Sequence, residues 1–282
     1  MTTRETHPGA AFRALHARAG AFVIPNPWDR GTACILASAG FEALATTSAG
    51  FAYSHGVPDG GVTRAQVLAH CREIVGATEL PVSADLENGF GDTPEEVAET
   101  IRAAAATGLA GGSIEDHTGR PEDPIYDFNL AVDRVAAAVE AVRALPHDFV
   151  LTARAENFLH RRRDLDDTIK RLQAFEAAGA EVLYAPGLAD MESIRTVCAA
   201  VTRPVNVVMG LAGTDFSVAA LAEAGVKRIS VGSALARLAY GAVLKAGQEM
   251  AGPGTFGYAN DAAPYKALQD IFATFQGREE SS

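Results

Sequence analysis

The sequence contains few cysteines, few aromatic side chains and no excess of positive charge. Its three cysteines, Cys34, Cys71 and Cys198, form no C-x-x-C motif, so neither a zinc site nor a disulfide framework is expected. The net charge of −11 argues against a nucleic-acid partner, which requires a basic surface. The sequence has neither an apolar run of about 18 residues, as a membrane span needs, nor a signal-peptide-like N-terminus. We therefore expect a soluble, cytoplasmic protein without membrane partners.

The amino-acid composition is dominated by aliphatic residues. Apolar residues make up 48% of the chain and aromatic residues only 7%, a balance that suits many helices packed on a sheet of branched aliphatic side chains. A chain of 282 residues is also a common length for a single α/β barrel. The composition therefore favours a globular α/β protein.

Glycine marks where helices end and strands begin. Four segments share an alanine-rich helix, a small residue with glycine, and then a β-rich run: 38–47, 106–116, 177–186 and 223–232. Four further β-rich runs lie between or before them: 21–26, 80–87, 148–156 and 203–210. Eight strands alternating with helices predict an α/β fold, a (β/α)8 TIM barrel. A doubly wound open sheet is the alternative, but the G-x-G-x-x-G turn that it would favour after its first strand is missing.

The chain continues beyond the eighth strand. A helix is expected at about 234–250, followed by a Gly/Pro-rich break and a last helix at about 264–276. We therefore divide the chain into a barrel domain, 1–250, and a C-terminal extension, 251–282. A barrel does not need the last helix, so we expect it to pack outside, on this subunit or on a neighbouring one, in a homo-oligomer.

Carboxylates gather where the strands end. Asp85 and Glu87 end the third strand, Glu115 ends the fourth, and Asp59 lies in the loop after the second. Barrel active sites form at these C-terminal strand ends. Carboxylates without cysteine or clustered histidine are typical ligands of Mg²⁺ or Mn²⁺. The sequence thus predicts a metal site there, although each acid alone could be an ordinary ion pair or helix cap.

Other polar groups at the same rim predict substrate contacts. Arg154, at the end of the fifth strand, could clamp a carboxylate and neutralise an oxyanion, or it could form a salt bridge to Glu156 or Glu115. Asn206 is a further candidate, in the seventh strand. A substrate carboxylate could also bind at the segment TTSAG, whose first three residues are Thr46, Thr47 and Ser48.

The motifs TTSAG…GVPDG (46–60), SADLENGFG (83–91), SIED (113–116) and TARAE (152–156) together resemble the isocitrate lyase/phosphoenolpyruvate mutase superfamily. The resemblance covers about residues 20 to 245. It implies a (β/α)8 barrel whose last helix is exchanged between subunits, a homodimer or homotetramer, and Mg²⁺ as cofactor. It also implies a small anionic 2-oxo acid as substrate or product, with a pyruvate-like enolate held on the metal.

The resemblance also assigns roles to individual residues. Asp85 would be the principal metal ligand, while Asp59, Glu87 and Glu115 would hold metal-bound waters. Arg154 would bind carboxylate and enolate oxygens. The substrate carboxylate would be received by Thr46, Thr47 and Ser48.

Two departures from the family pattern affect the expected reaction. Many relatives carry Asp in place of Glu87. The loop 117–128, HTGRPEDPIYDF, lacks the K-K-C-G-H segment of the isocitrate and methylisocitrate lyases, whose cysteine supplies a proton. Lyase action of that type is therefore not expected. His117 is the candidate acid or base in this loop, because histidine titrates near neutral pH, although a lone loop histidine is often only solvated.

These observations predict an enzyme of the lyase or phosphonomutase (isomerase) type in carboxylic acid metabolism. It would cleave or rearrange a C–C or C–P bond of a small 2-oxo acid, as an oxaloacetate decarboxylase, a lyase or a phosphonomutase does. The alternative is a catalytically silent barrel that binds a small carboxylate as a sensor or structural subunit. A Schiff-base aldolase is disfavoured, because no lysine lies at a predicted strand end.

Overall fold

The computed structural model describes residues 7–211 and 213–276. Its single sheet has eight strands: β1 (Phe22–Ile24), β2 (Leu44–Ala45), β3 (Val82–Asp85), β4 (Gly111–Glu115), β5 (Val150–Arg154), β6 (Val182–Tyr184), β7 (Val205–Val208) and β8 (Arg228–Ser230). The strands pair in parallel in the order β1-β8-β7-β6-β5-β4-β3-β2. A hydrogen bond from the Ala45 N–H to the Pro25 carbonyl (3.0 Å) joins β2 to the end of β1. The predicted (β/α)8 barrel is confirmed.

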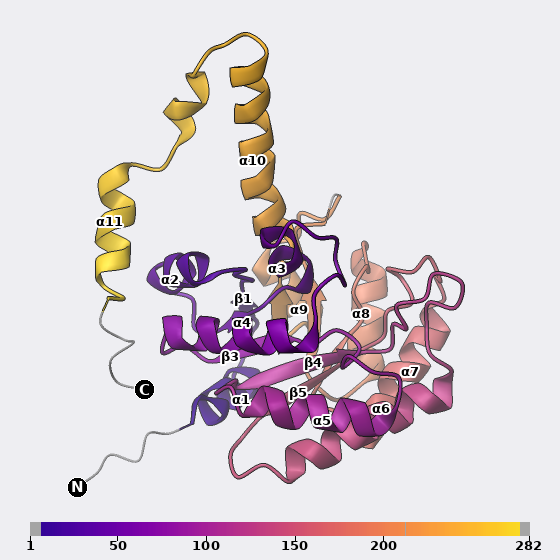
Figure 1. Ribbon diagram of the computed structural model, residues 1–282. Coiled ribbons are helices and arrows are strands. Elements are labelled where there is room, and N and C mark those ends of the chain that lie inside the picture. The colour runs from indigo at the N-terminus through magenta and orange to yellow at the C-terminus, as the bar shows by residue number, and fades with distance from the viewer. Residues whose placement is uncertain (1–6, 212, 277–282) are drawn as a thin grey trace, which may run out of the picture.

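Helices surround this barrel (Figure 1). Those that follow the strands are α2 (Arg30–Ser38), α3 (Ser48–Ser54), α4 (Arg64–Ala77), α5 (Pro94–Ala105), α6 (Phe128–Arg143), α7 (Leu165–Ala178), α8 (Met191–Ala200), α9 (Val218–Glu223) and α10 (Ala234–Ala251). The others are α1 (Pro8–Ala17), before the barrel, and η1 (Gly257–Asp261) and α11 (Tyr265–Ala273), after it. No described helix combines the length and apolar character that a membrane span needs.

Local sequence signals explain several of these helix ends. Thr93 and Glu96 form a capping box at the start of α5, with Pro94 in its first turn, as the sequence predicts. Asp29 caps α2 in the same way through Thr32. α7 ends at Gly179, whose φ of 111° lies in the left-handed region that glycine adopts readily.

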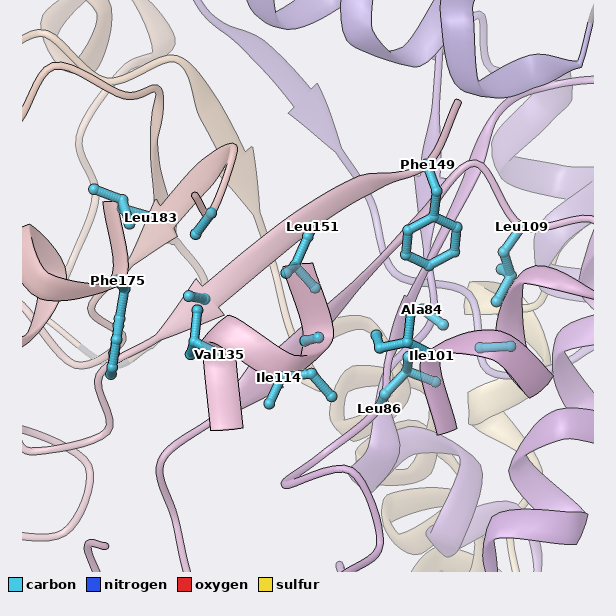
Figure 2. Close-up of a cluster of buried hydrophobic side chains, with 14 of the residues drawn as sticks. Ala84, Leu86, Ile101, Leu109, Ile114, Val135, Phe149, Leu151, Phe175 and Leu183 are labelled. Carbon is cyan, nitrogen blue, oxygen red and sulfur yellow. The ribbon is translucent and has the colours of Figure 1, made fainter. Parts of the chain in front are cut away.

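The main core lies between the sheet and its helices. Because side chains alternate along a strand, every second residue faces outward. Figure 2 shows side chains from the strands meeting those from α5, α6 and α7; the labelled set includes Leu86, Ile114, Leu151, Leu183, Ile101, Val135 and Phe175. This layer fixes the strands, and therefore the positions of the residues at their ends.

A second, smaller cluster closes the N-terminal end of the barrel. The ring of Phe12 on α1 lies against Gly111 of β4, where a Cβ would come within 3.0 Å of it. The rings of Phe12 and Phe22 meet edge to face, 6.5 Å apart. Other members of this cluster are Ile24, Ala43, Ala110, Val150 and Val182. These apolar side chains plug the end of the barrel opposite to the predicted site.

The C-terminal segment leaves the barrel as an arm formed by α10, η1 and α11. Figure 1 shows that α10 projects from the barrel and that the chain then turns back, so that α11 lies near α2. α11 contacts α2, where the Phe272 ring approaches Gly31. Several large apolar side chains of the arm are exposed: Leu238, Val243, Leu244, Met250, Phe256 and Tyr265. The predicted domain division and helix exchange between subunits stay predictions.

Candidate active site

Four neighbouring strands each end in a polar side chain that faces the barrel interior. Asp85, Glu115, Arg154 and Tyr184 are the last residues of β3, β4, β5 and β6. Glu115 is directly opposite Arg154 in the strand register, and Arg154 is opposite Tyr184. Regular strand geometry therefore brings these side chains together at the C-terminal rim, as predicted.

Arg154 is the centre of this group. Its guanidinium contacts three carboxylates: Nη1 lies 2.9 Å from Asp85 Oδ1, Nη2 lies 2.9 Å from Glu115 Oε2, and Nε lies 2.8 Å from Glu156 Oε1. The guanidinium also lies 5.1 Å from the ring centre of Tyr184. Although burial opposes the charge, the carboxylates raise the pKa of Arg154 well above its usual value. The salt bridges that the sequence left as an alternative are present, and they orient the guanidinium within the site.

Glu87 occupies a conformation that few side chains adopt. Its φ of 51° is left-handed, and its N–H donates to Asp85 Oδ1 at 3.3 Å. Its Oε1 is buried and has no hydrogen-bond partner. Burial, followed by the charges of Asp85, Glu115 and Asp59, raises the pKa of Glu87 to about 8. Backbone strain and an unpartnered polar atom therefore coincide at this residue.

Asp59 lies across the rim in the loop between α3 and α4. It is open to solvent on one side, and its carboxylate is close enough to Asp85 to be affected by it. Desolvation on its inner side, followed by the charge of Asp85, raises the pKa of Asp59, while a hydrogen bond with Ser48 opposes the shift. The Arg154 guanidinium thus contacts three carboxylates, and two more, Asp59 and Glu87, line the space above it.

The donor set fits a hard divalent cation that keeps several of its waters. No three His, Cys, Asp or Glu side chains of residues 7–211 and 213–276 are arranged to hold a metal by themselves. Mg²⁺ commonly binds through one or two carboxylates and retains water in its other positions. The excess of carboxylates and the unpartnered Oε1 of Glu87 both favour an added positive charge. The residues fit Mg²⁺ with few direct ligands.

The segment after β2 is built into the rim by hydrogen bonds. The Thr46 hydroxyl accepts from the Asp85 N–H (2.9 Å), and the Ser48 N–H donates to Asp85 Oδ2 (3.2 Å). The Thr47 hydroxyl caps α3, a short helix where the sequence predicted a loop. Asn26, which sequence reasoning missed, donates to the Thr46 carbonyl and accepts from the Val231 and Gly232 N–H groups. Its position at the end of the first predicted strand could have indicated a residue of the rim.

Two connected hollows open at this rim. The deeper, of about 180 Å³, extends into the barrel and includes Thr46, Thr47, Asp85 and Tyr184 in its lining. The wider, of about 580 Å³, lies above it under the loops after β3, β4 and β5. Residues on the boundary line both hollows: Ser48, Asp59, Arg154 and Leu159. The predicted rim residues thus surround one continuous space, although the hydroxyls of Thr46 and Thr47 already accept backbone hydrogen bonds.

His117 faces the wider hollow from the loop after β4. Its Nδ1 lies 3.6 Å from Glu115 Oε1, and its ring stacks on that of His160 at 3.9 Å. The loop is held by Asp92, which accepts hydrogen bonds from Arg120 and Tyr126. Sequence reasoning missed His160, because only the fold brings the loops after β4 and β5 together. The three cysteines lie on α2, α4 and α8, away from this loop.

Asn206 lies deeper than expected. It lines the narrow hollow, but its amide is engaged by Ser230, to which it donates at 3.1 Å, and by Arg228, from which it accepts at 2.8 Å. Asn206 is therefore held inside the barrel, away from the rim where the acids gather.

Comparison with known proteins identifies the family. The family model for phosphoenolpyruvate phosphomutase matches residues 12–251. The chain belongs to the isocitrate lyase/phosphoenolpyruvate mutase superfamily. It is 34% identical over 206 residues to 2-methylisocitrate lyase of Escherichia coli (strain K12), covering 70% of this chain and 68% of that protein.

Solved structures agree with this family. A Burkholderia cenocepacia J2315 protein, described provisionally as a lyase/mutase, is 60% identical with a TM-score of 0.92, covering 94% of this chain and 95% of that one. A 2,3-dimethylmalate lyase of the superfamily is 28% identical with a TM-score of 0.84, covering 98% and 96% of the two chains. The predicted family and enzyme class, a lyase or mutase of this superfamily, are confirmed.

Proposed function

We propose that this superfamily member is a Mg²⁺-dependent enzyme that cleaves or rearranges a C–C or C–P bond of a small 2-oxo acid through an enolate. Mn²⁺ could replace Mg²⁺. The observation that carries the proposal is the crowding of five carboxylates at the rim, three of them in contact with Arg154, with Glu87 Oε1 left without a partner. The names of 2-methylisocitrate lyase and 2,3-dimethylmalate lyase support a small carboxylic acid as substrate.

Asp85 would hold the cation directly, while Asp59, Glu87 and Glu115 would hold its waters. When bound, Mg²⁺ would supply Lewis acidity, which draws electron density from the oxygens of a 2-oxo acid. The chain contributes the placement of these carboxylates. Asp85 is fixed by the Ser48 N–H and by Arg154, so its carboxylate orientation is set before any ligand binds.

Arg154 would stabilise the negative charge that develops on the enolate oxygen. Breaking the bond at C3 leaves its electron pair on the 2-oxo acid fragment, where it is delocalised onto the C2 oxygen. The guanidinium is oriented in advance by Glu115 and Glu156 and shielded on one face by Tyr184, so little reorganisation is needed. Losing one such donor costs about 10²–10³-fold in rate in other enzymes.

His117 would transfer the proton that completes a cleavage reaction. A lyase must protonate the carbon that loses its bond, and an imidazole within reach of the site can transfer that proton. His117 lines the hollow above Arg154, and Glu115 lies near its Nδ1. The Glu115 carboxylate and the His160 ring would orient the imidazole.

Turnover measurements test this proposal. The full-length protein would be given oxaloacetate, phosphonopyruvate and a panel of 3-substituted malates with Mg²⁺, alongside Asp85→Asn as a matched variant. We expect at least one compound to be consumed by the wild type and none by the variant. Complete inactivity combined with tight, metal-dependent binding would instead support a silent barrel that acts as a carboxylate sensor.

We also propose that the protein is a homodimer or homotetramer joined through the C-terminal arm. Phe256 is 67% exposed and Tyr265 is 80% exposed, and apolar side chains of α10 are exposed on the same arm. Covering them would bury apolar surface between subunits. Light scattering should give a multiple of the 29.4 kDa chain mass. Leu244→Glu should lower that mass, whereas a wild-type monomer would contradict the proposal.

A further inference from the structure

The middle of the barrel is polar where a TIM barrel usually packs branched apolar side chains. The narrow hollow continues from the rim into this layer. Buried polar residues facing the interior here come from β3, β4, β5, β7 and β8: Ser83, Ser113, Thr152, Asn206, Arg228 and Ser230. All except Thr152 also line the hollow. A polar, hollow interior implies a ligand group that reaches below the rim.

Arg228 is the charged member of this layer, and it is 5% exposed. Its Nε donates to Asn206 Oδ1 (2.8 Å) and its Nη2 to Thr152 Oγ1 (2.9 Å), while Nη1 lies 3.4 Å from His16 Nε2. A guanidinium has five N–H donors, so these three contacts leave two unused. No carboxylate of the described residues pairs with it.

Two other buried arginines differ from Arg228. Arg171 forms ion pairs with Asp116 and Asp167. Arg134 donates to backbone carbonyls of the segment 88–92. Arg228 has neither a carboxylate nor a backbone carbonyl, and only neutral side chains hold it. His16 stays neutral beside it, because burial and then the charge of Arg228 lower the pKa of His16 to about 3.

Arg228 and Arg154 line the same hollow at different depths. Arg154 ends β5 at the rim, whereas Arg228 begins β8, at the floor. We propose that Arg228 binds a second carboxylate of the substrate, below the rim where Arg154 lies, and so selects small dicarboxylates. This inference rests on the proposed function, which places the reacting end of the substrate at Arg154.

The chemistry of the floor suits a carboxylate. A buried guanidinium without a counter-charge is costly, and an anion that accepts its two unused N–H donors would offset that cost. The hydroxyl of Ser113 lines the same hollow and could donate to a further carboxylate lone pair, whereas that of Ser230 donates to the Val207 carbonyl (3.4 Å). Asn206 and Thr152 act as positioning residues, since they fix the guanidinium and leave its remaining donors for the ligand.

Calorimetric titration of two matched acids with Mg²⁺ present tests the deep site. Malate and 2-hydroxybutanoate share a 2-hydroxycarboxylate head and differ in a distal carboxylate versus a methyl group. Neither belongs to the set of compounds whose turnover tests the proposed function. We expect the wild type to bind malate at least about tenfold more tightly. Arg228→Met should weaken malate binding about 10–100-fold and leave 2-hydroxybutanoate within about twofold.

A second variant keeps the proposal testable if Arg228→Met does not fold. Ser113→Val narrows the same hollow without removing a charge and should also weaken malate selectively; thermal melts would confirm that each variant is folded. Equal affinities for the two acids in the wild type, or an unchanged ratio in the folded variants, would overturn the deep site. The proposed function would then still stand if both acids bind and depend on Arg154. Binding of neither acid to the wild type would also overturn the deep site, whereas the proposed function is overturned only if no compound of the turnover set is consumed.

Discussion

At the C-terminal end of the barrel five carboxylates gather at the rim and three of them contact Arg154, whereas at the N-terminal end Phe12 and Phe22 close the interior with buried rings. The rim contains a left-handed Glu87 with an unpartnered oxygen; the plug is packed so closely that Gly111 has no room for a side chain. A site that binds a ligand keeps polar groups without partners, and these groups cost folding free energy. The packed apolar side chains at the opposite end offset that cost. Changes at the two ends should therefore act on different properties.

The largest effect is expected at the rim. Asp85→Asn removes the proposed direct ligand with little change in volume, and we expect turnover to fall by about 10³-fold or more, about 4 kcal/mol of transition-state stabilisation. The free energy of unfolding without metal should change little, because relief of one crowded charge offsets the loss of hydrogen bonds that Asp85 accepts from the Ser48 N–H or from Arg154. Steady-state kinetics and denaturant unfolding would measure the two effects. If Asp85→Asn lost stability together with activity, the rim would also support the fold, which would contradict the proposed difference between the two ends.

Phe12→Ala tests the plug. Phe12 is fully buried, so truncation should lower the free energy of unfolding by about 3–5 kcal/mol through a cavity. Phe12→Leu, the milder control, should cost less. Turnover per folded molecule should stay within about twofold, because the ring lies far below the rim acids. A large loss of turnover in the folded variant would show that the plug also shapes the site.

Glu87→Gln should change how the stability of the protein depends on pH and on divalent metal. The pKa of Glu87 is raised to about 8, so the native state holds its proton more tightly than the unfolded chain does. Stability from this group is thus present below pH 4.5 and lost as pH rises to about 8. Without divalent metal, the variant should be about 1–2 kcal/mol more stable than the wild type at pH 8, with a flatter pH profile. Saturating Mg²⁺ should remove this advantage; equal stabilities without metal would contradict the account.

The plug should show the opposite pH dependence. The pKa of His16 is lowered to about 3, so the unfolded chain binds the proton more tightly there. Stability from this group is complete above about pH 6.5 and is lost as pH falls toward 3. At pH 5 the loss should be about 1–2 kcal/mol, and His16→Gln should reduce it. His55→Gln, at an exposed site, is the control. An identical acid profile in all three proteins would contradict this assignment.

Much of the fold and rim could be predicted because both follow from regular strand geometry. Glycines that end helices and the apolar runs that follow them indicate eight strands. The alternation of side chains along each strand then places Asp85, Glu115 and Arg154 on one rim. Arg228 could not be recognised in the run VKRIS, because a strand-initial arginine resembles a solvated charge until closure turns it inward. Asn26 and His160 were missed for a related reason: their partners come from loops distant in sequence.

Magnesium binding tests the central claim most directly. Calorimetry on the full-length protein at pH 7 should detect one site for Mg²⁺ in the wild type and none in Asp85→Asn. Asp190→Asn, which alters the remote cap of α8, should bind as the wild type does. Absence of heat in the wild type, or equal uptake by Asp85→Asn, would contradict the assignment of the acidic rim to a divalent cation.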